Sequence, residues 1–188
     1  MQTRKGNDRI VFIFPRIKLV IKIPFIHLFL AFSPFFKKED RKVEYLKNYF
    51  TYPLECYGGF KRLMFKGIVD NWNECYFYWK TKNPFLQPTY FSLFGILNVQ
   101  LYGNSCNLKT VDLWCQLYEL TEGKVFDDSH HFANENNFCF HKEKLRMLDY
   151  GSKRTHNVIK QYGKKIVELF NNNYCWEVEK LKFKKLNT

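Results

Sequence analysis

Two oxygen-bearing side chains frame a short apolar hairpin in the C-terminal half of the chain. Asn137 precedes the run Phe138-Cys139-Phe140, and Asp149 follows a second apolar run at 145–148. The two ends of a β-hairpin lie side by side, so the amide and carboxylate oxygens can meet over one Mg²⁺, which prefers hard oxygen ligands. Gly151 then lets the backbone turn away from a bound ion. Asn137 and Asp149 are therefore the predicted metal ligands.

A second polar group lies just before this hairpin, where Asp128 is followed by His130 and His131. A carboxylate at such a place can orient a hydroxyl nucleophile or accept its proton. Adjacent residues of a strand point in opposite directions, which disfavours one metal shared by both histidines. The alternative is that one histidine only supports the loop.

A cation and an anion interrupt apolar segments in the N-terminal half. Lys22 lies in a β-branched run, and Glu74 lies between Trp72 and Cys75 in a segment with helical spacing. If Glu74 is buried, its carboxylate needs a charged or hydrogen-bonding partner. The alternatives are a lysine that extends to water from a sheet edge and a glutamate on the surface.

The elements that must position these residues follow from the spacing of apolar side chains. Two β-branched runs, 9–14 and 18–23, are separated by Pro15-Arg16-Ile17 and predict a hairpin. Helical spacing predicts helices at 37–50, 60–81, 108–120 and 155–170, the last opened by Thr155. Further strands are expected at 89–101 with a break near Gly95, at 138–140, at 144–148 and at 175–183, whereas residues 1–9 are expected to fray. This order predicts an α+β fold.

Composition limits the classes of protein that the chain can belong to. Its 188 residues include 19% aromatic side chains, which excludes extended disorder and collagen-like polymers. The net charge of +12 is concentrated at the ends: residues 1–66 carry 14 basic against 5 acidic side chains, and residues 152–188 carry 9 against 3. Such basic ends suit an acidic protein, a nucleic acid or anionic lipid, and the alternative is a solvated surface. The six cysteines lack zinc-site spacing, so we expect reduced thiols and a cytoplasmic location.

The most apolar stretch, residues 10–36, is interrupted by Arg16, Lys18 and Lys22. Its charge-free remainder, 23–36, contains Pro24 and Pro34 and is shorter than the about 20 residues of a spanning helix. We expect no transmembrane span. The segment can instead lie at a membrane interface, bind a partner or fill a core.

The order of these motifs resembles the protein-kinase-like fold. In that family a His-x-Asp-x-x-x-x-Asn loop leads to a strand pair and then to Asp-Phe-Gly or Asp-Tyr-Gly. With Asn137 on the loop asparagine, His130 takes the place of the histidine, and Asp149-Tyr150-Gly151 matches the metal-binding triplet.

The N-terminal half matches the same family. The run Leu19-Val20-Ile21-Lys22 resembles the strand with the phosphate-gripping lysine. Residues 67–79 resemble the helix whose glutamate pairs with that lysine, especially in small bacterial and phage kinase-like proteins, and Glu74 is the matching position. Gln100 falls near the hinge that meets adenine.

The resemblance implies ATP and Mg²⁺ as cofactors and a minimal kinase-like fold. Its core would cover residues 10–151, with an N-lobe sheet and helices at 10–101 and a truncated C-lobe at 102–151. A basic tail at 1–9 would precede this core, and a basic helix and tail at 152–188 would follow it.

Three departures keep other functions open. Phe132 stands where the catalytic aspartate belongs, and an insertion in the loop could return Asp128 to that place. With that insertion the resemblance implies catalytic roles for Asp128 and His130. Gly6 stands alone where a glycine-rich loop is expected, and 37 residues follow Gly151. The first reading is an ATP-dependent transfer of phosphate to a hydroxyl group. The alternatives are a non-catalytic pseudokinase scaffold and an unrelated basic protein that binds nucleic acid or a membrane surface.

Overall fold

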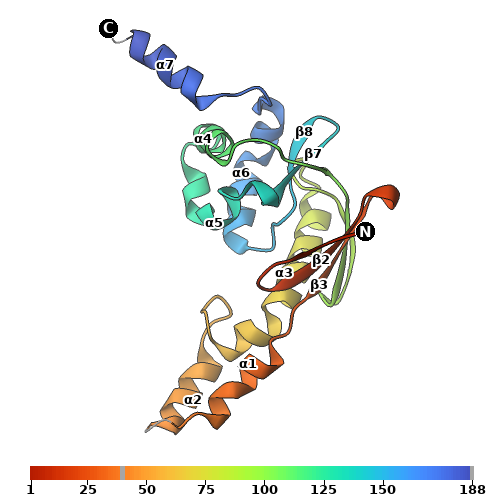
Figure 1. Ribbon diagram of the computed structural model, residues 1–188, viewed down its shortest axis with the longest axis vertical. Helices are drawn as coiled ribbons and strands as arrows, with labels where there is room; N and C mark the ends of the chain where they lie inside the picture. Colours follow the sequence, from red (N-terminus) through yellow and green to blue (C-terminus); the bar gives the residue numbers. More distant parts are fainter. Residues whose placement is uncertain (39–40, 187–188) are drawn as a thin grey trace. The chain divides into compact units, whose positions relative to one another are not determined.

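The computed structural model describes residues 1–38 and 41–186 and shows an α+β fold (Figure 1). The chain divides into two compact units. The first unit contains Met1–Cys75 and Thr89–Tyr102, and the second contains Tyr76–Pro88 and Gly103–Thr188. Each unit has an antiparallel sheet.

The first unit is built on a five-stranded sheet in the order β1-β2-β3-β5-β4. Its strands are β1 (Gln2–Lys5), β2 (Arg9–Phe14), β3 (Leu19–Pro24), β4 (Thr89–Leu93) and β5 (Leu97–Leu101). The short helix η1 (Pro15–Ile17) joins β2 to β3, which confirms the predicted hairpin. In its register Val11 lies opposite Lys22 and Ile13 opposite Val20. Because side chains alternate along a strand, Arg9, Ile13 and Lys22 project from one face of the sheet.

Helices follow β3 in the first unit. These are α1 (Leu28–Phe32), η2 (Ser33–Phe36), α2 (Lys42–Thr51) and α3 (Phe60–Thr81). Helix α3 belongs to this unit up to Cys75, and its last turns, from Tyr76, belong to the second. The bounds of α3 confirm the helix predicted at 60–81. The helix predicted at 37–50 begins later, at Lys42, and its residues Glu39 and Asp40 lie outside the described part of the chain.

Gly67 allows α3 to approach the β2–β3 hairpin closely. A Cβ at this position would lie 2.2 Å from the Asp8 carbonyl oxygen and 2.9 Å from the Pro24 Cβ. The first of these neighbours is backbone and cannot rotate away, so a larger residue would push the helix from the hairpin. The small residue at 67 therefore sets how near Glu74, two turns later on α3, comes to the sheet.

We predict that Gly67→Ala destabilises the protein by about 2 kcal/mol, because the clash outweighs the roughly 1 kcal/mol that alanine gains in helix propensity. Urea unfolding followed by circular dichroism measures this change. Gly6→Ala is the matched control, since its nearest neighbour would lie 3.4 Å away, and it should leave stability nearly unchanged. A Gly67→Ala variant as stable as the wild type would contradict the close approach.

The second unit has a three-stranded sheet and a helical core. Its strands, in the order β6-β7-β8, are β6 (Asn104–Ser105), β7 (Phe138–His141) and β8 (Lys144–Met147). Its helices are α4 (Thr110–Leu120), η3 (Lys124–Asp128), α5 (Ser129–Phe132), η4 (Glu135–Asn137), α6 (Lys153–Leu169) and α7 (Trp176–Leu186). The core is apolar and includes Leu117, Phe132, Phe138, Met147 and Ile166.

The structure corrects three expectations at the ends of the chain. Residues 1–9 do not simply fray, because β1 pairs with β2 through its backbone although its side chains are exposed. The strand predicted at 175–183 is the helix α7, whose acidic first turn and basic last turn suit the helix dipole. Helix α6 is capped by Ser152 rather than by Thr155.

No helix among residues 1–38 and 41–186 is both long and apolar enough to cross a membrane.

Candidate functional site

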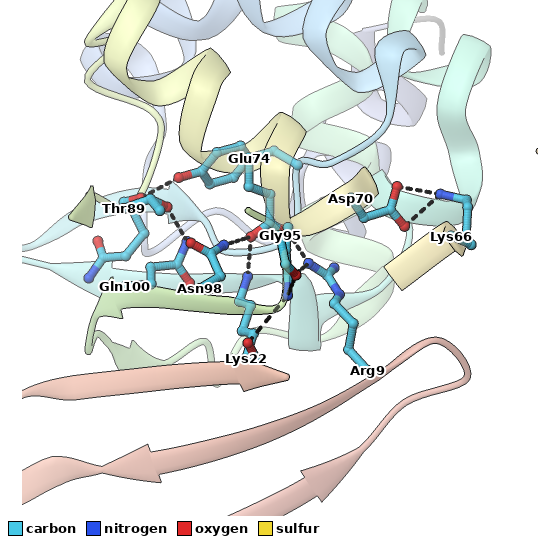
Figure 2. Close-up of polar contacts among 12 residues, drawn as sticks. Arg9, Lys22, Lys66, Asp70, Glu74, Thr89, Gly95, Asn98 and Gln100 are labelled. Atoms are coloured by element: carbon cyan, nitrogen blue, oxygen red, sulfur yellow. Dashed lines mark hydrogen bonds and ion pairs between the residues drawn. The ribbon is translucent and has the colours of Figure 1, made fainter. Parts of the chain in front are cut away.

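The first unit buries an ion pair between the sheet and α3. Glu74 is fully buried, and its Oε2 lies 2.7 Å from the Nζ of Lys22, which is 4% exposed. Lys22 comes from β3 and Glu74 from α3, and Figure 2 shows the two side chains pointing toward one another. The structure therefore brings together the cation and the anion that the sequence places in apolar segments.

Further polar side chains complete the surroundings of Glu74. The Nη1 of Arg9 lies 2.5 Å from its Oε1, and the Nδ2 of Asn98 donates to its Oε2 at 3.0 Å. Asn71 accepts a hydrogen bond from Arg9 and donates to the backbone carbonyl oxygens of Lys22 and Gly95. Each carboxylate oxygen of Glu74 thus faces a cation in a place from which water is excluded.

Gln100 lies two residues after Asn98 on β5. It is fully buried within β5, opposite Val20 of β3, and its Nε2 lies 3.4 Å from the Thr89 Oγ1 (Figure 2). These contacts lie inside the sheet. Its expected contact with adenine stays a prediction.

We predict that Glu74→Gln lowers the free energy of unfolding by about 3–5 kcal/mol, because it leaves Lys22 and Arg9 buried without their counter-charge. Urea unfolding at neutral pH measures the loss. Glu44→Gln, on a side chain that is 65% exposed, is the matched control and should change stability by less than about 0.5 kcal/mol. A loss of less than about 1 kcal/mol for Glu74→Gln would show that the buried charge is dispensable.

In the second unit, the β7–β8 hairpin brings Asn137 next to the segment that contains Asp149. Phe138 pairs with Met147, and the Leu148 amide donates to the Asn137 carbonyl oxygen at 2.7 Å. The Asn137 Nδ2 donates to the His131 carbonyl oxygen at 3.0 Å, so the Oδ1 is the amide atom suited to ligate a cation. The register thus supports the expectation that these two residues lie at one end of the hairpin.

Tyr150 fixes the backbone directly after Asp149. Its ring is fully buried, and its hydroxyl donates to the Gln87 carbonyl oxygen at 2.7 Å. Its own carbonyl oxygen lies 2.6 Å from the Nε2 of His156, whose ring stacks on Phe77 with 3.7 Å between centroids. Asp149-Tyr150-Gly151, which resembles the metal-binding triplet of kinase-like proteins, is therefore held in place by its central residue, Tyr150.

Burial lowers the pKa of His156 to about 4, and the charge of Lys160 acts in the same direction, while the hydrogen bond to Tyr150 opposes both. In the unfolded chain a histidine titrates near 6.5. Between these values the unfolded state binds more protons than the folded state, so stability falls as the pH drops from about 6.5 to about 4.

We predict that this histidine alone lowers the free energy of unfolding by about 2 kcal/mol across that pH range. His156→Phe keeps a ring against Phe77 and removes the titration, so the pH dependence of urea unfolding should become flatter. His130→Phe on the exposed face of α5 is the control and should keep the wild-type slope. An unchanged slope in His156→Phe would contradict the neutral, buried histidine.

Asp128 is buried between a loop and α6. It is 8% exposed; its Oδ1 lies 2.8 Å from the Nδ1 of His131, and its Oδ2 accepts a hydrogen bond from Thr155. Burial raises its pKa, but the hydrogen bonds from His131 and Thr155 and the charge of His131 outweigh this and lower the pKa. Asp128 is therefore an ionised carboxylate with both oxygens in hydrogen bonds.

The other residues of this loop have different surroundings. His130 is exposed on α5, and its ring centroid lies 5.2 Å from that of His131. Phe132, at the position of the expected catalytic aspartate, is fully buried in the apolar core. The histidine that contacts Asp128 is thus His131, and the catalytic role of His130 stays a prediction.

Sequence reasoning missed Arg9, Asn71, Asn98, Thr155 and His156. A signal existed for Arg9, because it lies on the same face of the β2–β3 hairpin as Lys22. No local pattern marks the other four, since their partners come from distant parts of the chain.

No family model, curated protein or solved structure matches this chain. Within the described residues, no cluster of three or more His, Cys, Asp or Glu side chains could hold a metal ion.

Proposed function

We propose that this protein binds ATP with Mg²⁺ and transfers the γ-phosphate to a hydroxyl group, in the manner of a minimal protein-kinase-like enzyme. The observation that carries the proposal is the buried Lys22–Glu74 ion pair between a central strand and the following long helix. A lysine held in this way is a fixed cation, and phosphoryl transfer depends mainly on positioning and on charge stabilisation.

In this proposal Lys22 contacts the α- and β-phosphates. Glu74 keeps the lysine extended, and Arg9 and Asn98 keep Glu74 in place.

Asn137 and Asp149 are the proposed Mg²⁺ ligands. Mg²⁺ keeps several waters and takes few protein ligands besides substrate phosphates, so an amide and a carboxylate at one end of a hairpin fit its chemistry without a larger acidic cluster. When bound, Mg²⁺ would neutralise charge on the phosphates. Tyr150, held by Gln87 and His156, fixes the backbone that presents Asp149.

The transfer breaks the bond between the γ-phosphorus and the oxygen that bridges it to the β-phosphate. A bond from the acceptor oxygen to that phosphorus forms, the hydroxyl proton passes to Asp128, and ADP leaves.

We predict a thermal shift of about 3 °C or more with about 1 mM ATP and Mg²⁺ when the ligand is about tenfold above its dissociation constant. Asp149→Ala should remove the dependence on Mg²⁺, and Lys22→Met should weaken binding of ATP with or without the metal. Asp127→Ala, on an exposed neighbouring side chain, is the matched control and should bind as the wild type does. No shift at millimolar ATP would contradict the proposal.

A second candidate function is a nucleotide-binding scaffold without turnover, and the surroundings of Asp128 favour it. Both of its carboxylate oxygens already accept hydrogen bonds, and Phe132 is buried where the resemblance expects the catalytic aspartate. Measuring ADP release separates the two candidates. Turnover that is lost in Asp128→Asn supports the enzyme, and Mg²⁺-dependent ATP binding without turnover supports the scaffold.

A further inference from the structure

Bulky apolar side chains in the segment between β3 and α2 are exposed to solvent and do not pack into the core of the first unit. Phe29 is 88% exposed and Phe36 is 85% exposed, and Leu28 and Leu30 are more than half exposed. We call these four residues the exposed apolar segment. Single exposed apolar residues are ordinary, but a group of four within nine positions is of the kind that marks an interaction site.

This exposure follows from how α1 is oriented. Its small residue Ala31 is fully buried, whereas the large side chains on either side of it are exposed. The Tyr49 hydroxyl donates to the Ala31 carbonyl oxygen at 2.8 Å, so α1 lies beside α2 (Figure 1). Helix α1 thus packs Ala31 against the rest of the first unit and leaves its larger side chains exposed to solvent.

An aromatic cluster holds the segment in this orientation. Phe60 of α3 lies between Phe32, Tyr49 and Phe50, with ring centroids 4.8–6.3 Å apart. Phe35 also contacts Phe50 at 5.8 Å. Because these rings fix α1 and α2 on α3, the exposed apolar segment is presented by packed structure and not by a loose loop.

Basic side chains adjoin the segment. Lys37, Lys38, Arg41, Lys42 and Lys47 are all exposed, and the Nζ of Lys42 donates to the Phe35 carbonyl oxygen at 2.8 Å. Residues 37–47 carry five basic against three acidic side chains, in a chain of net charge +12. Bulky apolar side chains next to lysines are the combination that binds an anionic lipid surface, where the apolar groups enter the interface and the cations contact headgroups.

We propose that the exposed apolar segment docks this protein on anionic lipid membranes, with Phe29 and Phe36 inserted among the lipids and Lys37 and Lys38 at the headgroups. The segment lies on the surface of the bilayer without crossing it. This inference does not rest on nucleotide binding, and either can fail without the other.

Co-sedimentation with vesicles tests the proposal. The probe is phosphatidylcholine containing about a third phosphatidylglycerol, compared with phosphatidylcholine alone, at about 0.05 M and about 0.5 M salt. The wild type should bind the anionic vesicles, and binding should weaken at high salt. Phe29→Asn with Phe36→Asn should reduce the affinity at least about tenfold, and Lys37→Gln with Lys38→Gln should reduce it about tenfold and flatten the salt dependence.

The matched control replaces two exposed phenylalanines elsewhere, Phe94→Asn with Phe183→Asn, which are 75% and 67% exposed in the wild type. This variant should bind vesicles as the wild type does. The proposal is overturned if the wild type stays in the supernatant, or if the control variant Phe94→Asn with Phe183→Asn loses as much affinity as Phe29→Asn with Phe36→Asn. It is also overturned if Phe29→Asn with Phe36→Asn leaves vesicle binding intact and instead converts a dimer to a monomer in analytical ultracentrifugation, because the segment would then bind a second copy of the chain.

Discussion

The burial of one carboxylate, Glu74, is the constraint on which the first unit depends. A carboxylate in a place without water is stable only where cations and hydrogen-bond donors meet it. Arg9 from β2, Lys22 from β3 and Asn98 from β5 supply them, so three strands and α3 must hold one register for the charge to be satisfied. Gly67 permits the close approach of helix and hairpin that this arrangement needs.

The second unit organises its polar residues differently. Its core is apolar, and its candidate site residues lie where helices and strands begin or end. Asn137 directly precedes β7, Asp149 follows β8 and Asp128 directly precedes α5. Each is oriented by partners from elsewhere in the unit, such as Thr155 on α6, or through the anchored neighbour Tyr150. Positions fixed in this way, at the ends of rigid elements, are where binding and catalytic residues are commonly found.

The sequence predicts those parts that local pattern determines. The β2–β3 hairpin, α3 and the β7–β8 hairpin follow from apolar periodicity, whereas the pairing of Lys22 with Glu74 is implied by the resemblance to a kinase-like strand and helix. It does not predict that Arg9 shares that carboxylate, or that His131 and Thr155 hold Asp128, because these contacts depend on tertiary packing. The strand predicted at 175–183 is a helix because glutamate, lysine and leucine favour helices more strongly than partial alternation favours a strand.

The central claim is that Glu74 holds Lys22 as a cation for the phosphates of a nucleotide. An ATP analogue that carries an acyl phosphate transfers its acyl group to a lysine amine beside the phosphates, and peptide mass spectrometry then locates the modified residue. The account predicts modification of Lys22, protection by excess ATP with Mg²⁺, and loss of the modification in Glu74→Gln but not in Glu44→Gln. Modification of Lys22 that ATP does not suppress, or ATP-protected modification of a different lysine, would contradict it.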